Sequence, residues 1–148
     1  MDCRNALVEA EGHLEKALQI LKGQSLVKVE KKKNRMAAQG LIESYVHAGG
    51  RIGAMVELNC ETDFVARTSE FKELAHNLAM QVAAMSPQFV APEDIPTGSE
   101  LDPKTACLVL QSYIRDQTAT IQDIINQTIA KTGENVRVSR FARFEVGE

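Results

Sequence analysis

The sequence contains few of the residues that support covalent chemistry or metal binding. Its 148 residues include only three cysteines and three histidines. The cysteines are odd in number and far apart, so neither a disulfide framework nor a zinc site is expected, and a reducing compartment is the simpler interpretation. The histidines form no HxH or HExxH spacing, and no glycine-rich phosphate-binding loop is present. These absences favour a binding protein over an enzyme, with no cofactor and no metal.

The sequence also lacks a large excess of charge and a long apolar run. Its net charge of −3 argues against binding to nucleic acid through bulk charge. No stretch is apolar for long enough to cross a membrane, so no membrane partner is expected. The first residues, MDCRNALVEAEG, are typical of neither a signal peptide nor a transit peptide. The length suits one domain, or one core with a small appendage.

The N-terminal third of the chain predicts a small helical segment and a basic connection. Apolar residues at helical spacing over 6–10 and 14–21 predict two short helices, the second ending at Gly23. The run KVEKKKNR, 28–35, has a net charge of +4. It is interpreted as a solvated linker, with a contact for an acidic partner or RNA as the alternative. The predicted division is a helical segment over 1–24, a basic linker over 25–36 and a core domain over 37–148.

The core domain is expected to be α+β, with a three-stranded antiparallel sheet that helices cover on one face. Period-two alternation on either side of HAGGR predicts a hairpin with strands near 40–46 and 52–58. Helices are predicted to begin after a cap at Thr68 or Ser69 and after Thr120. The proline-containing stretch over 86–104 predicts an extended loop.

A last strand over 135–146 is expected to complete the sheet. Strict alternation predicts that Val136, Val138, Ala142, Phe144 and Val146 share one face. The opposite face of the sheet would then carry Tyr45, Met55 and Phe141, and it is interpreted as half solvated or as an interface.

The connection NCETDFVART, 59–68, places an aromatic ring at the tip of a loop. Phe64 lies off the apolar stripes of both flanking elements. An exposed Phe side chain on a turn indicates a contact with a partner or another functional role. A nucleophilic role for Cys60 is disfavoured because the nearby acids Glu61 and Asp63 would raise its pKa. These two acids have no third ligand in reach by sequence, so they predict no metal site. The exposed loop is therefore the candidate working part.

The segment VELNCETDFVAR resembles the signature of the elongation factor Ts family. Three other stretches agree in the same order along the chain. MDCRNALVEAEGHLEKALQIL is similar to two helices of the family's ubiquitin-associated-like domain, and GLIESYVHAGGRIGAMVEL resembles its core hairpin. IAKTGENVRVSRFARFEVGE resembles its last helix and strand. A single signature copy resembles members with one core repeat. The family's first helix has no counterpart before Met-Asp-Cys, and only a short bridge over 97–111 replaces a longer helical excursion.

The resemblance implies a guanine-nucleotide exchange factor that binds elongation factor Tu carrying GDP. In the family, the signature loop enters the GTPase domain, displaces magnesium and promotes GDP release during translation elongation, without covalent chemistry. Carried over, the loop is Thr62, Asp63, Phe64 and Val65, with Cys60 and Arg67 as supporting contacts. Members with one core can pair as homodimers. The implied compartment is the bacterial cytoplasm, or a plastid or mitochondrion.

Three alternatives stay open at this point. An RNA- or ribosome-associated domain would use residues 31–33 with Arg137, Arg140 and Arg143, although direct nucleic-acid binding is not the expectation. A cysteine hydrolase would use Cys60. A plain interaction domain would fold Phe64 back onto its own core.

Overall fold

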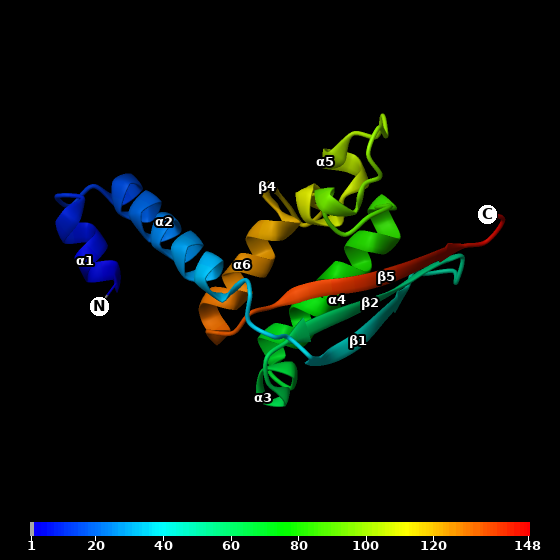
Figure 1. Ribbon diagram of the computed structural model, residues 1–148, viewed down its shortest axis with the longest axis horizontal. Coiled ribbons are helices and arrows are strands. Elements are labelled where there is room, and N and C mark those ends of the chain that lie inside the picture. The colour runs from blue at the N-terminus through cyan, green and yellow to red at the C-terminus, as the bar shows by residue number, and fades with distance from the viewer. Residues whose placement is uncertain (1) are drawn as a thin grey trace.

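A computed structural model describes residues 2–148 and confirms the α+β class (Figure 1). Its helices and strands, with the 3₁₀ turns η1 and η2, are α1 (Asp2–Glu9), α2 (Leu14–Lys32), β1 (Gln39–Val46), β2 (Ile52–Cys60), α3 (Asp63–Ala66), α4 (Ser69–Met85), η1 (Pro92–Asp94), α5 (Pro103–Ala106), η2 (Leu108–Leu110), β3 (Ser112–Tyr113), β4 (Asp116–Thr120), α6 (Ile121–Thr132) and β5 (Arg137–Glu145).

The predicted three-stranded antiparallel sheet is present, in the order β1-β2-β5. β1 and β2 form the expected hairpin, with Val46 opposite Gly53 at its turn. Along β2, Ala54, Val56 and Leu58 are buried, which is the alternation that the sequence predicts for a strand with one covered face.

The last strand departs from the predicted face assignment because it contains a β-bulge. The register between β2 and β5 shifts between Glu57 and Leu58, which leaves Ser139 as the extra residue. One extra residue reverses the alternation beyond it. The prediction of one common face was therefore wrong: Val136 and Val138 are buried, whereas Ala142, Phe144 and Val146 are exposed.

The prediction for the uncovered face is corrected for two residues: the register shift moves Phe141, and Tyr45 lies opposite buried Ala54 in the β1–β2 pairing, which the shift does not affect. Phe141 lies opposite Val56 and packs with Tyr45 against the hydrophobic core, so both side chains are on the helix-covered face. Met55 stays on the uncovered face, as predicted, and is 49% exposed.

Two well-capped helices, α4 and α6, supply half of the buried residues of the core, and α4 packs against all three strands of the sheet. The Thr68 hydroxyl accepts a hydrogen bond from Phe71 N at 3.3 Å and begins α4. Thr120 and Asp123 form a capping box at the start of α6, which ends at Gly133 with a φ of 76°. The buried side chains of these helices meet β2 in one cluster: Phe71, Leu74, Leu78, Val82, Ile121, Ile125 and Ile129.

Helix α2 is longer than the sequence predicts. It runs through Gly23 to Lys32, so the predicted stop at Gly23 is wrong, and residues 25–32 of the predicted linker are helical. A glycine inside a helix costs only about 1 kcal/mol, which packing can offset. The C-terminal part of α2 contacts α6, and Val29 packs against the core. The connection to the sheet is therefore limited to residues 33–38.

The bridge between α4 and α6 is mostly irregular, as predicted for 86–104, but it also contains a short β3–β4 hairpin that the sequence did not predict. Buried Gln81 fixes this hairpin: its amide donates to Gln111 Oε1 and Ser112 O at 3.1 Å, and its carbonyl accepts from Ile114 N at 3.0 Å. Over residues 2–148, no helix has the length and apolarity that a membrane crossing requires.

Candidate functional site

The signature loop (residues 62–65) is an ordered turn between β2 and α4. Thr62 caps the single helical turn α3, because its hydroxyl accepts from Val65 N at 3.4 Å. Thr68 closes the other end, donating from Oγ1 to Val65 O at 2.7 Å while it also caps α4. The loop is therefore held by hydrogen bonds at both ends.

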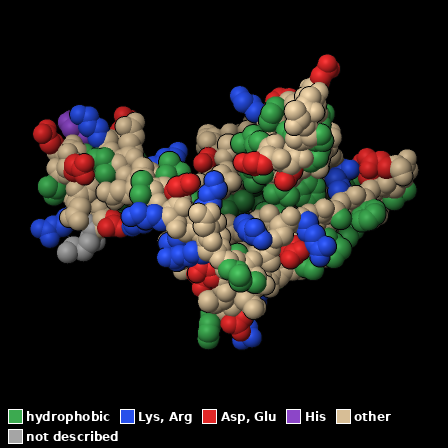
Figure 2. Space-filling view, viewed as in Figure 1, with side chains coloured by type: hydrophobic (Ala, Val, Ile, Leu, Met, Phe, Trp, Pro, Cys, Tyr) green, Lys and Arg blue, Asp and Glu red, His purple; other side chains and the backbone are tan. Residues whose placement is uncertain are grey.

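Two adjacent apolar residues of the loop point in opposite directions. Val65 is 9% exposed and belongs to the hydrophobic core, which anchors the turn. Phe64 is 79% exposed. The prediction that Phe64 is exposed is confirmed, and the alternative in which it folds back onto its own core is wrong. Figure 2 shows hydrophobic side chains projecting from the end of the molecule where Figure 1 places α3.

The charged residues of the loop form weak surface pairs. Asp63 and Arg67 pair at 3.2 Å over one helical turn, and both side chains are more than half exposed. Arg35 pairs with Glu61 at 3.7 Å. Exposed ion pairs contribute little to stability. Asp63 and Arg67 can therefore exchange these contacts for contacts with a partner.

A carboxylate from the turn between α6 and β5 accepts hydrogen bonds from the start of the loop. Glu134 Oε1 accepts from Glu61 N at 3.1 Å and from Thr62 N at 3.0 Å. Glu134 Oε2 accepts from the Thr62 hydroxyl at 2.7 Å. Sequence reasoning missed Glu134, because it lies more than 70 residues from the loop and only the antiparallel pairing of β2 with β5 brings it close.

Cys60 lies beneath the loop and not on its surface. It is fully buried, and its Sγ donates to Thr62 O at 3.0 Å. Burial raises the pKa of the Cys60 thiol, and the negative charge of Glu134 raises it further. Cys60 therefore lacks the exposure and the low pKa that a nucleophile requires. Among the described residues, no three His, Cys, Asp or Glu side chains are grouped so that they could hold a metal ion.

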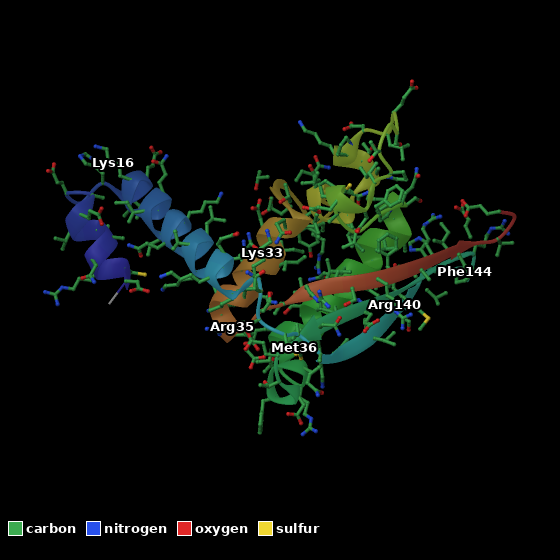
Figure 3. The ribbon with its side chains drawn as sticks, in the orientation of Figure 1. Lys16, Lys33, Arg35, Met36, Arg140 and Phe144 are labelled. Atoms are coloured by element: carbon green, nitrogen blue, oxygen red, sulfur yellow. The ribbon has the colours of Figure 1, made fainter. Side chains whose placement is uncertain are left out.

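The uncovered side of the sheet forms a second exposed apolar surface, here called the open sheet face. Phe144 is 75% exposed and lies on this face with the ion pair between Arg140 and Glu57 at 2.7 Å (Figure 3). Contiguous exposed apolar surface marks an interaction site. Its exposed apolar members are Ile42, Val46, Met55, Phe144 and Val146.

The basic residues considered for RNA binding differ in their contacts: Arg140 and Arg143 form ion pairs, whereas Lys33 and Arg137 line one surface pocket together with Arg35. Arg143 is half-buried: its Nε donates to Ala83 O at 3.0 Å, and its guanidinium pairs with Glu145 and Glu148. Arg140 is paired with Glu57. Lys33 and Arg35 lie beside the exposed Met36 in the connection after α2 (Figure 3). Two members of the set that an RNA-binding domain would use, Arg140 and Arg143, are thus engaged with carboxylates of the same chain.

Fold and site together define an α+β binding domain that presents an ordered aromatic loop. The family model described as Elongation factor TS matches residues 23–102. Elongation factor Ts of Thermotoga neapolitana is 47% identical over 176 residues, which cover 100% of this chain and 89% of the relative. Elongation factor Ts of Moorella thermoacetica is 43% identical over 178 residues, covering 100% and 88%.

The chain belongs to the elongation factor Ts family, and so to the elongation factors of protein biosynthesis. The 176 aligned residues exceed the 148 of this chain, so the relative contains residues without a counterpart here. This difference agrees in direction with the short bridge expected over 97–111, although the position of the extra residues stays a prediction.

Proposed function

We propose that this chain is a guanine-nucleotide exchange factor that binds elongation factor Tu carrying GDP and promotes GDP release during translation elongation. The observation that carries the proposal is the exposed ring of Phe64 on a turn held at both ends. Membership of the elongation factor Ts family supports the partner. Both of the relatives named above come from bacteria, which favours the cytoplasm as the compartment over a plastid or mitochondrion.

The mechanism follows from burial of that ring in the partner. A GTPase holds GDP through Mg²⁺ and through backbone donors around the phosphates. Transferring Phe64 from water into an apolar slot of the GTPase domain gains roughly 1.5–3 kcal/mol. If the slot opens only when the magnesium site is disturbed, this free energy opposes nucleotide binding. The carboxylate of Asp63 acts at the same step, because it brings negative charge towards the magnesium and its phosphate ligands.

The proposed activity forms and breaks no covalent bond. Coupling between two ligands is reciprocal, so a chain that weakens GDP binding is itself bound less tightly when GDP is present. Exchange therefore proceeds in either direction, and an excess of GTP over GDP determines the net outcome. On this proposal the chain is not an enzyme and needs no cofactor.

The decisive experiment follows release of fluorescent GDP from elongation factor Tu by stopped flow. Micromolar chain should accelerate release, and Phe64→Ala should lower the maximal rate by roughly 10- to 100-fold, the equivalent of the lost burial. Asp63→Ala should lower the maximal rate with a smaller effect on binding of the partner. Phe144→Ala is the matched control, because it removes an equally exposed ring on the open sheet face and should leave release unchanged.

The proposal fails if well-folded chain leaves the rate of GDP release unchanged. It also fails if Phe64→Ala and Phe144→Ala reduce the rate equally, because the effect would then follow total exposed apolar surface and not the loop.

We also infer that two copies of the chain pair through the open sheet face. The five exposed apolar side chains of this face favour a partner with the same surface, and a two-fold interface is self-complementary. Phe144→Glu should convert a dimer to a monomer in sedimentation analysis while Phe64→Glu should not. Identical masses for both variants and the parent chain would contradict the pairing.

A further inference from the structure

We propose that Glu134 is a positioning residue for the signature loop: its carboxylate sets the orientation in which Phe64 is presented. This inference deepens the proposed function and rests on it. Glu134 is not part of the loop sequence, and it approaches from the turn between α6 and β5.

The first step is the strength of the contact. One Glu134 carboxylate receives three donors, Glu61 N and Thr62 N on Oε1 and the Thr62 hydroxyl on Oε2, at 2.7–3.1 Å. Hydrogen bonds to an ionised acceptor are roughly twice as strong as neutral ones. Both backbone donors lie between the end of β2 and the start of α3, so the carboxylate fixes the path of the chain where it leaves the sheet.

The second step is the direction of the Thr62 hydroxyl. A hydroxyl carries one proton and two acceptor lone pairs. Because Thr62 Oγ1 donates its proton to Glu134, only lone pairs face Val65 N, which donates to Oγ1 at 3.4 Å. Glu134 therefore maintains Thr62 as the N-cap of α3, the turn that carries Phe64.

The third step is a hydrogen bond in the opposite direction between the same two segments. Glu61 Oε1 accepts from Asn135 N at 2.8 Å, so loop and turn each supply a carboxylate to the other's backbone. The buried side chain of Asn135 donates to Arg35 O at 2.8 Å and anchors the turn on the connection that follows α2. Glu134 is thus held in place by the body of the protein and not by the loop alone.

The consequence for exchange is preorganisation. A helical turn of four residues is not stable by itself in water. An ordered loop avoids an ordering cost when it enters the partner. Without the Glu134 carboxylate, Phe64 would occupy its productive orientation for a smaller fraction of the time, and the maximal rate of GDP release would fall.

The kinetic test compares Glu134→Gln and Glu134→Ala with Glu100→Ala, a matched control in the exposed part of the bridge. Glu134→Ala should lower the maximal rate about tenfold or more, with less than about a threefold change in the half-saturating concentration. Glu134→Gln keeps one carbonyl acceptor for the two backbone donors, so it should retain part of the maximal rate that Glu134→Ala loses. Glu100→Ala should match the parent chain.

A merely structural role would give a different pattern. Partial unfolding lowers the concentration of active chain, so it would raise the half-saturating concentration and lower the melting temperature while leaving the maximal rate intact. That pattern for Glu134→Ala would overturn the proposal, as would a maximal rate equal to that of the parent chain.

Amide hydrogen exchange tests the positioning without the partner. In Glu134→Ala, the amides of Glu61 and Thr62 should exchange at least about tenfold faster, while those of Val56 and Leu58 in β2 stay protected. Unchanged exchange at Glu61 and Thr62 would overturn the proposal. If the parent chain does not accelerate GDP release, the proposed function fails, and this measurement still decides whether Glu134 orders the loop.

Discussion

The pair of N-terminal helices and the body (residues 39–148) use apolar residues in different ways. Between α1 and α2, the buried cluster consists of Ala6, Ala10 and Ala17. In the body, a continuous cluster joins the sheet to α4 and α6 and includes fully buried Phe71, Leu58 and Ile121. Figure 1 shows the helix pair extending away from the sheet, with only the end of α2 near α6.

The difference in side-chain size determines where the stability resides. An alanine buries a single methyl group, whereas burial of a Leu, Ile or Phe side chain contributes about 1.5–3 kcal/mol. Ile20 and Leu21 are only partly buried against this cluster, and other large apolar residues of the helix pair remain largely exposed, with Leu14 at 67%, Leu18 at 57% and Val8 at 72%. The same helical spacing of apolar residues therefore predicts a helix correctly in both regions, but it predicts a hydrophobic core only in the body.

The largest expected effect is a difference in hydrogen exchange between the two regions. Amides of β2 open only with the whole body, whose unfolding free energy should lie within about 5–15 kcal/mol. Amides over residues 2–21 should exchange at least about a thousandfold faster, because their local unfolding exposes little apolar surface. Exchange measured by mass spectrometry on peptides from both regions checks this. Equal protection would mean that the helix pair and the body unfold together.

Paired leucine substitutions test the same contrast through stability. Leu74 is 4% exposed in the core, so Leu74→Ala should destabilise the body by about 2–5 kcal/mol through the cavity it leaves. Leu18 is 57% exposed on α2, and Leu18→Ala should change the unfolding free energy by less than about 0.5 kcal/mol. Urea unfolding followed by circular dichroism measures both. Equal losses would show that Leu18 is buried in solution against a surface outside the described contacts.

The sequence predicts those parts of the fold that local signals determine. The caps at Thr68 and Thr120 and the stop at Gly133 mark α4 and α6, because a side-chain oxygen or a left-handed glycine acts within one turn. The helix through Gly23 and the bulge at Ser139 were missed because they depend on packing against α6 and on strand register. Neither depends on neighbouring residues in the chain.

In the candidate site, too, some features follow from local sequence signals and others depend on the folded structure. Phe64 could be predicted to be exposed, because it lies off the apolar stripes of both flanking elements. The inward turn of Val65 and the support from Glu134 could not, because Val65 is buried where α3 meets β1, β2 and α4, and Glu134 reaches the loop only from the turn between α6 and β5. In this chain, the exposed candidate residue of the loop is therefore easier to predict from the sequence than the residue that holds the loop.

Cysteine labelling provides a chemical comparison of the two regions. Cys3 on α1 is exposed, whereas Cys60 at the end of β2 is buried. Burial also raises the pKa of the Cys60 thiol, so little reactive thiolate forms at neutral pH. Iodoacetamide at neutral pH should modify Cys3 at least about a hundredfold faster than Cys60 in the folded protein. Preferential labelling of Cys60 would contradict its burial and favour a cysteine nucleophile.

The smallest expected effect concerns two surface ion pairs and their response to acid. In the body, the Arg140 side chain bound to Glu57 lowers the pKa of that carboxyl below its ordinary value of 4.5, with a further contribution from Asn59. A pKa that is lower in the folded state stabilises the protein above the unfolded value. The contribution is then lost as the pH falls through the folded value. The parent chain should therefore be more stable than Glu57→Gln at pH 7, and the two should converge as the pH falls below 4.5. Urea midpoints at a series of pH values measure the difference.

Asp2→Asn is the control: it removes the ion pair with Lys28 that joins α1 to α2, and it should leave the unfolding midpoint of the body unchanged at every pH. A constant difference between the parent chain and Glu57→Gln across the whole pH range would assign the effect to packing of the side chain and not to its charge.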